Sequence, residues 1–331
     1  MKQLISLAAS AALLVACGDR QAAESTQDAA SAAPQSAAAE TATQAAPLIP
    51  RNVIFGNPDR TLARISPDGA YVSWLAPKDG VLNVWVAPSD NPSDARVITN
   101  DTYRGISQYF WAPNSSFVYY IQDQGGDENF HVYSANIDTG DVVDLTPVKD
   151  GVRATVESIS SQRPDEIVVG INERNAQLFD LYLVDVTTGE RELLKENPGF
   201  AGWLIDNNLD PRFGFQPTPD GGGNIVDFEG EVFAVIPPED FLSTTAVGFN
   251  AANDALFILD SRGRDTAALT RVALGSGDVE VLAENDAADI SGIFVDRRTL
   301  VPIAYNVNHL KAQWLPVDDS TAADLEGLTA A

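Results

Sequence analysis

The chain has 331 residues, a formal net charge of −26, and a hydrophobic fraction of 44%. A chain of this length can bury a substantial core, either in one large domain or in two modest ones. A surface this acidic repels nucleic acid and anionic lipid, so we expect no nucleic-acid partner, and the charge favours solubility.

The first 17 residues predict a lipoprotein signal peptide. Lys2 supplies a positive charge, and the apolar stretch 4–15 is too short to span a bilayer. It ends in LVAC, the pattern of a lipobox, and Cys17 is the chain's single cysteine. The cysteine thiol can form a thioether to a diacylglycerol. We therefore expect lipidation at Cys17, attachment to a membrane through it, and a place in the bacterial cell envelope facing the periplasm. The competing interpretation is a plain secretory signal with a chance cysteine.

Residues 18–47 are almost entirely Ala, Ser, Gln, Thr, Glu and Asp, and they include no aromatic side chain. Such a segment cannot bury enough surface to offset the entropy of ordering, so we expect a disordered tether. About thirty residues reach at most roughly 100 Å when extended. A helix is the competing interpretation, but the segment has no apolar stripe with which to pack.

From residue 62 onward, short apolar runs alternate with turn residues. In the first unit, the runs 62–66 and 71–75 flank the turn SPDG at 66–69, where proline presets one dihedral angle and glycine accepts a positive φ. Turns in the same place recur at intervals of roughly 42 to 51 residues, which is the repeat length of a propeller blade. These turns are Pro113-Asn114, Pro164-Asp165, Asn207-Asn208, Asn253-Asp254 and Asp296-Arg297.

A second marker keeps the same phase: tight turns at 138–141, 187–190 and 275–278 precede a fourth apolar run. The fourth unit is the weakest, with only Glu229-Gly230 at this place. We predict an all-β fold over 48–316, a β-propeller of four-stranded antiparallel blades with six blades of an expected seven. The sixth unit, begun at Ile290, is incomplete at the C-terminus, and 317–331 is an acidic, Ala-rich tail, helical or loose. A β-sandwich also has closely spaced strands, but it needs no four-strand period.

Three stretches carry more specific motifs than the repeat itself: 49–69, 109–130 and 261–265. The second contains DQGGDENF at 123–130 and is the most specific, whereas SPDG is common among propellers. Together they resemble the N-terminal propeller of bacterial prolyl oligopeptidase-family serine peptidases, of the dipeptidyl aminopeptidase and acylaminoacyl peptidase type. The likeness covers residues 48–316. It implies a seven-bladed propeller that filters substrates by size, followed by an α/β-hydrolase domain that holds a Ser-Asp-His triad. By that comparison the chain is truncated before the hydrolase domain, and no catalytic residue of the family can be carried over.

The residues themselves show no hydrolase machinery. A serine nucleophile of this class needs a G-x-S-x-G turn. The nearest run, Gly105-Ile106-Ser107, continues into Tyr109, where a tyrosine would clash in such a turn. The two histidines, His131 and His309, lie in strand-like or loop-like patterns and are interpreted as structural. We therefore assign no catalytic residue and expect no peptidase activity from this chain alone.

Two polar loops remain as candidates for interdomain or ligand contacts. Asp127 and Glu128 lie in a connecting turn that lacks the ligand spacing of an EF-hand, so we assign no metal and no cofactor. Arg262 and Arg264 follow a predicted strand, and two arginines could bind a carboxylate in a bidentate way. The simpler interpretation of this second loop is a solvated turn or an ion pair within one blade.

The sequence therefore predicts the non-catalytic, substrate-gating propeller part of a lipid-anchored serine peptidase that acts on peptides. Peptides would be substrates only if the propeller were joined to a hydrolase domain. The alternative is a stand-alone propeller lipoprotein that serves as a binding scaffold in the cell envelope, which should have a closed ring with a complete last blade. A propeller enzyme that uses groups along its central channel is a third hypothesis, and two histidines count against it.

Overall fold

The computed structural model describes residues 48–330, so the predicted signal peptide (1–17), Cys17 and the tether (18–47) lie outside the described residues. The chain divides into two compact units, one up to Gly56 and one from Asn57 onward. In the first unit, the short helix α1 (Arg51–Phe55) exposes the side chains of Ile54 and Phe55. Within 48–330, every helix is too short or too polar to cross a bilayer.

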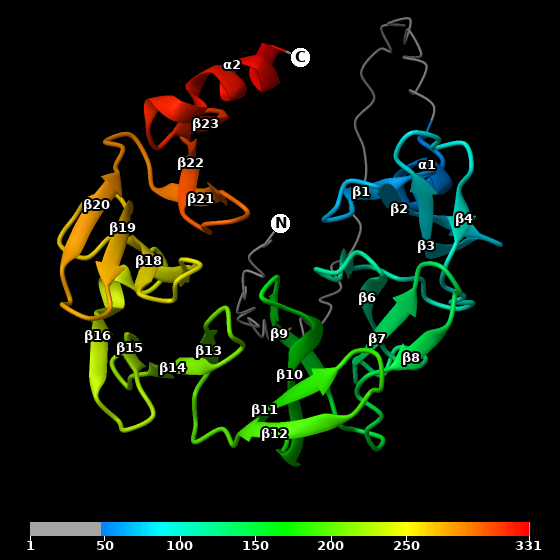
Figure 1. Cartoon of the computed structure of the whole chain (residues 1–331), viewed down its shortest axis with the longest axis horizontal. Coiled ribbons are helices and arrows are strands. Elements are labelled where there is room, and N and C mark those ends of the chain that lie inside the picture. The colour runs from blue at the N-terminus through cyan, green and yellow to red at the C-terminus, as the bar shows by residue number, and fades with distance from the viewer. Residues whose placement is uncertain (1–47, 331) are drawn as a thin grey trace, which may run out of the picture. The chain divides into compact units, whose positions relative to one another are not determined.

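The second unit consists of six antiparallel sheets, each built from strands that are consecutive in sequence (Figure 1). Sheets 1 to 3 contain β1 (Thr61–Ile65), β2 (Tyr71–Lys78), β3 (Val81–Pro88), β4 (Arg96–Val97); β5 (Tyr109–Trp111), β6 (Phe117–Gln122), β7 (His131–Asn136), β8 (Val142–Asp144); and β9 (Ala154–Ser160), β10 (Arg163–Asn175), β11 (Leu178–Asp185), β12 (Arg191–Lys195). Sheets 4 to 6 contain β13 (Gly202–Ile205), β14 (Pro211–Pro217), β15 (Gly223–Val226), β16 (Val232–Ile236); β17 (Thr245–Phe249), β18 (Ala255–Asp260), β19 (Ala268–Ala273), β20 (Val279–Ala283); and β21 (Ile290–Val295), β22 (Pro302–Asn308), β23 (Ala312–Pro316).

This arrangement confirms the predicted β-propeller and excludes the sandwich. Within each sheet the first strand lies innermost and the last strand outermost (Figure 1). Five sheets have four strands, and the sixth has three, followed by the 3₁₀ helix η2 (Asp319–Thr321) and helix α2 (Ala322–Ala330). A second 3₁₀ helix, η1 (Pro238–Asp240), lies between sheets 4 and 5.

Apolar clusters join each sheet to the next. The cluster around Tyr109 and Val84 joins sheets 1 and 2, and the cluster around Ile167 and Leu145 joins sheets 2 and 3. Smaller clusters join the later sheets in the same order. Within residues 48–330, no buried cluster joins sheet 6 to sheet 1. The core is therefore a series of sheet-to-sheet interfaces.

Burial is highest in the middle strands of a sheet, the second and third, and lower in the first and last strands. Every residue of β18 is buried, because both faces of this strand meet a neighbouring sheet. In β20, the outermost strand of the same sheet, Val279, Glu280 and Val281 are exposed. Apolar sequence runs without strict alternation therefore mark the middle strands of a sheet. Runs that mix apolar and polar residues mark its outermost strand.

The first turn shows how the repeated turn residues act. Gly69 adopts a φ of 78° and donates its N–H to the carbonyl of Ser66 at 2.9 Å. The Ser66 hydroxyl donates to Asp68 at 2.6 Å, and this bond holds the pKa of the Asp68 carboxyl below its usual value. Proline at the intervening position presets the backbone dihedral that the turn needs. The turn is thus stabilised largely by its own residues.

Candidate functional site

The strand order divides the connections of the propeller between two faces. In a sheet of consecutive antiparallel strands, alternate connections lie at opposite ends. We call one end the turn face; it carries the first-to-second strand connections 66–70, 112–116, 161–162, 206–210, 250–254 and 296–301. We call the other end the loop face; it carries the second-to-third strand connections 79–80, 123–130, 176–177, 218–222, 261–267 and 309–311, with the segments between sheets. Both candidate loops from the sequence therefore lie on the loop face.

The loop 123–130 is held by its own hydrogen bonds. Asp127 accepts bonds from the backbone and side chain of Asn129, both at 3.1 Å, and these bonds lower the pKa of the Asp127 carboxyl. Glu128 has a φ of 60°, and its N–H donates to the buried Asp123 at 3.1 Å. The Glu128 side chain is exposed. The loop therefore presents two carboxylates to solvent from a fixed backbone.

Arg262 is anchored within sheet 5 and to sheet 4. It makes a bidentate contact with Asp260, with both N–O distances 2.7 Å, and donates to the Val235 carbonyl at 3.1 Å. Burial alone would raise the pKa of Asp260, but the hydrogen bonds from Arg262 outweigh burial and leave that pKa below its usual value. The guanidinium is thus already paired with a carboxylate, so binding a ligand carboxylate would require exchange of partners.

Arg264 has a weaker attachment, and we predict that Arg264→Ala changes the free energy of unfolding by less than about 1 kcal/mol. Its guanidinium contacts Glu284 at 3.1 Å, and the two side chains are 33% and 64% exposed. Solvent and salt screen such a pair. Urea unfolding of the variant and the parent chain tests this, and a loss above about 2 kcal/mol would contradict a surface role. The variant is therefore suited to testing ligand binding at the loop face.

The two candidate pairs come from different sheets. Asp127 and Glu128 belong to sheet 2, whereas Arg262 and Arg264 belong to sheet 5. In the described part of the chain, no hydrogen bond or ion pair joins one pair to the other. A role in binding stays a prediction for all four side chains.

His131 begins β7 at the loop face and is buried. Its Nδ1 lies 2.8 Å from Asp144 Oδ2, and its ring stacks on Tyr133 with centroids 6.2 Å apart. A histidine oriented by a carboxylate is half of a general-base arrangement, but catalysis also needs a nucleophile within reach. Among residues 48–330, Asp144 is the hydrogen-bond partner of the His131 ring.

A cluster of hydroxyl groups around Ser261 was missed by the sequence reasoning. The Ser261 hydroxyl donates to the buried Asp240 at 2.8 Å and lies 2.8 Å from the Ser243 hydroxyl and 3.0 Å from the Thr244 hydroxyl. Because its single proton goes to the carboxylate, the other two hydroxyls donate to its oxygen. The cluster ties the η1 segment to sheet 5 through the Asp240 carboxylate, and we interpret it as structural. Ser261 lies 17 to 21 residues from its three partners in sequence, and no local pattern reveals the cluster.

No group of three or more His, Cys, Asp or Glu side chains among residues 48–330 is placed to hold a metal ion. The loop face instead carries fixed backbone loops with separate charged side chains. This arrangement suits contact with another surface or with a polar ligand.

These features define the described part of the chain as a β-propeller domain with charged loops on one face. Comparison with known proteins relates it to peptidases. Over 288 residues it is 42% identical to dipeptidyl aminopeptidase BIII of Pseudoxanthomonas mexicana, across 86% of this chain and 42% of that protein. It is 31% identical over 185 residues to dipeptidyl peptidase family member 6 of Caenorhabditis elegans, across 54% of this chain and 25% of that protein. The chain thus spans less than half the length of these relatives.

Solved structures give weaker matches. Acylaminoacyl peptidase of Pyrococcus horikoshii aligns with a TM-score of 0.49 at 16% identity, over 83% of this chain and 46% of that one. The propeller domain of the trilobed protease from Pyrococcus furiosus aligns with a TM-score of 0.48 at 16% identity, over 79% and 84%. No protein-family model matches the chain. On the first relative's similarity, the chain is a propeller related to the dipeptidyl aminopeptidases, as the sequence motifs predicted.

Proposed function

We propose that this chain is the non-catalytic, substrate-gating propeller part of a lipid-anchored serine peptidase that acts on peptides. The observation that carries the proposal is the 42% identity to a dipeptidyl aminopeptidase, 42% of whose length the match spans. On this proposal a domain that corresponds to the rest of that relative's length supplies the catalytic serine. The propeller controls which peptides reach this serine. The reaction would be acyl transfer from a peptide bond to serine, followed by hydrolysis.

Two properties of the chain support a gating role. The loop face presents carboxylates on the fixed loop 123–130, and carboxylates attract the positively charged amino terminus of a peptide. The net charge of −26 acts in the same direction over a longer range. Peptides would be selected by size, because only short or extended peptides could move between the innermost strands of the sheets.

A chimeric enzyme tests the proposal. Residues 48–316 of this chain replace the matching region of the Pseudoxanthomonas mexicana enzyme, and hydrolysis of a dipeptidyl arylamide is compared with hydrolysis of longer peptides. We expect fluorophosphonate labelling and hydrolysis by the chimera, and neither by this chain alone. A folded chimera without activity, or covalent labelling of this chain alone, would contradict the proposal.

The lipid anchor is tested separately. On this proposal, the full chain expressed in a bacterium incorporates a clickable fatty acid and fractionates with membranes, whereas Cys17→Ser does neither. Equal membrane association of both forms would remove the anchor from the proposal and leave the peptidase relation untouched.

A further inference from the structure

Among the interfaces between consecutive sheets, the one between sheets 3 and 4 has the smallest apolar cluster. Its cluster has three fully buried members, Val168, Leu181 and Leu209, whereas the interfaces 1–2 and 2–3 bury eleven and ten residues. Sheet 4 contributes one of the three, Leu209, and this residue lies in the turn 206–210 with a φ of 66°. Apolar burial supplies most of the attraction between packed sheets. The junction of sheets 3 and 4 therefore has little buried apolar packing.

The inner strand of sheet 3 presents polar groups to this junction. A Cβ added at Gly170 would lie 2.7 Å from Glu157 Oε1 and 2.8 Å from Thr155 Oγ1, so these two side chains occupy the space over that glycine. Gly170 shares its face of β10 with Val168, which packs toward sheet 4. Thr155 donates its hydroxyl to Glu157 at 2.6 Å. A carboxyl and a hydroxyl therefore take the place of apolar contacts near the centre of the propeller.

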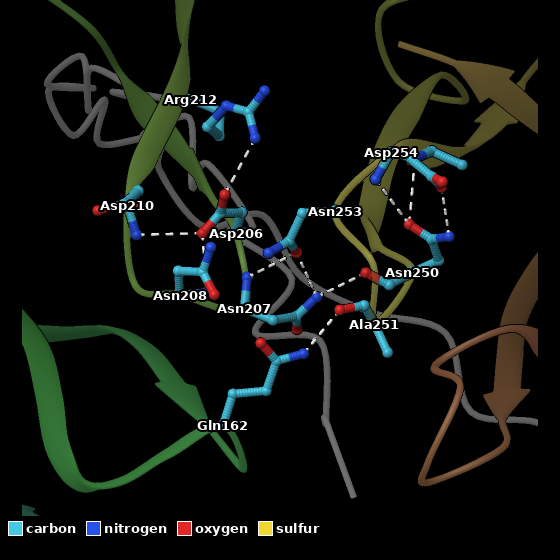
Figure 2. A network of polar contacts seen from close by, with 11 residues as sticks. Gln162, Asp206, Asn207, Asn208, Asp210, Arg212, Asn250, Ala251, Asn253 and Asp254 are labelled. Atoms are coloured by element: carbon cyan, nitrogen blue, oxygen red, sulfur yellow. Dashed lines mark hydrogen bonds and ion pairs between the residues drawn. The ribbon is translucent and has the colours of Figure 1, made fainter. Parts of the chain in front are cut away.

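A network of amide groups on the turn face bridges the junction (Figure 2). The buried Asn207 donates through Nδ2 to the Asn250 carbonyl and to Asn253 Oδ1, both at 2.7 Å. Its carbonyl accepts the hydroxyl proton of Ser160 from sheet 3. One residue thus joins sheets 3, 4 and 5.

The network continues past sheet 4. Gln162, in the turn 161–162 of sheet 3, donates to the Ala251 carbonyl in sheet 5 at 2.7 Å, crossing the turn of sheet 4 (Figure 2). The N–H of Ala251 donates in turn to the Thr299 carbonyl of sheet 6 at 2.8 Å. The turns of sheets 4, 5 and 6 are therefore tied together, and they reach sheet 3 through this same network.

From these contacts we infer that the propeller consists of two cooperative blocks, sheets 1–3 and sheets 4–6, latched on the turn face by Asn207 and Gln162. The blocks part first between sheets 3 and 4, where the buried apolar cluster is smallest. This is a hinge built into the fold, and it does not depend on the proposed peptidase function. Local opening of this kind draws on the least buried interfaces of a protein.

Amide hydrogen exchange of the full chain, read by mass spectrometry strand by strand, tests the inference. Asn207→Ala removes both amide bonds, and we expect exchange about tenfold faster in β14 and β18 with β6 and β10 unchanged. Asn208→Ala is the matched control, because that side chain is exposed and its carbonyl contact to Arg163 is a backbone one. We expect no change in any sheet for this control.

A second, milder variant tests the inference if Asn207→Ala does not fold. Gln162→Ala removes a single bond at an exposed site, and we expect about threefold faster exchange confined to sheets 4–6. Equal acceleration in all six sheets would show one cooperative unit and overturn the inference. No acceleration in either variant, or the same effect from Asn208→Ala, would overturn the latch.

Discussion

Tyr109→Ala is expected to lower the free energy of unfolding of sheets 1–3 by about 3–5 kcal/mol, as for other buried aromatic truncations. Tyr109 is 1% exposed and lies in the cluster between sheets 1 and 2. Its hydroxyl donates to the Leu62 carbonyl at 2.7 Å and lies 2.9 Å from the Ser73 hydroxyl. Burial raises the pKa of this phenol to about 12, although the Ser73 bond and Arg64 act against the rise. The side chain therefore stays neutral at physiological pH and supplies both packing and hydrogen bonds.

Tyr109→Phe separates the two contributions. This variant keeps the ring and leaves the Leu62 carbonyl without its phenol donor, so we expect a loss of about 1–3 kcal/mol. Urea unfolding followed by tryptophan fluorescence measures both variants, since Trp74, Trp85 and Trp111 lie in sheets 1 and 2. Equal losses for the two variants would show that packing at this position contributes little.

The architecture could be predicted from the sequence because each blade repeats local chemistry. Proline, aspartate and glycine at fixed places favour the first turn in any surroundings, and the second turn keeps the same phase. The fourth unit has the weakest repeat pattern in the sequence, because only Glu229-Gly230 matches its second turn. Its turn is in fact made by Asp227, whose carboxylate accepts the N–H groups of Glu229 at 3.0 Å and Glu231 at 2.8 Å. An aspartate that caps a turn is a local signal, so this turn can be predicted from the sequence.

The contacts between blades could not be predicted in the same way. Asn207 was recognised as a turn residue, but its partner Asn253 is 46 residues away, and a turn pattern contains no information about the neighbouring blade. The candidate pair of arginines illustrates the same limit. The sequence suggested an ion pair within the blade as the simpler interpretation, and Arg262 does pair with Asp260 two residues away. Which charged side chains remain available to a ligand depends on tertiary contacts.

Glu157 shows how a local pattern can mislead about burial. In β9 the sequence ATVESIS reads as a strand with one polar face, and a glutamate there would normally face water. In the structure the Glu157 side chain is half-buried and lies over Gly170, on the face of β10 that packs toward sheet 4. Burial raises the pKa of its carboxyl, and the hydrogen bond from Thr155 offsets only part of that rise.

We predict that Glu157→Gln stabilises the protein by about 1 kcal/mol at pH 8, the low end of the cost range for an incompletely satisfied buried polar group, because the side chain is half-buried. In the unfolded chain the carboxyl loses its proton near its ordinary pKa of 4.5, whereas in the folded chain it keeps the proton to a higher pH. Between these two values the folded state binds more protons, so the stability of the parent chain falls as pH rises. Below pH 4.5 both states are protonated, and the advantage of glutamine should shrink toward zero.

Urea unfolding from pH 4 to pH 8 measures this difference, with Glu192→Gln as the matched control. Glu192 is exposed on β12 of the same sheet, so its replacement changes the net charge equally without touching the junction. The difference between Glu157→Gln and the parent chain should grow with pH, while the control runs parallel to the parent. Parallel curves for both variants would mean that the Glu157 carboxyl is solvated in the folded protein. Because the carboxyl lies at the junction of the two blocks, the stabilisation should also slow amide exchange in sheets 4–6.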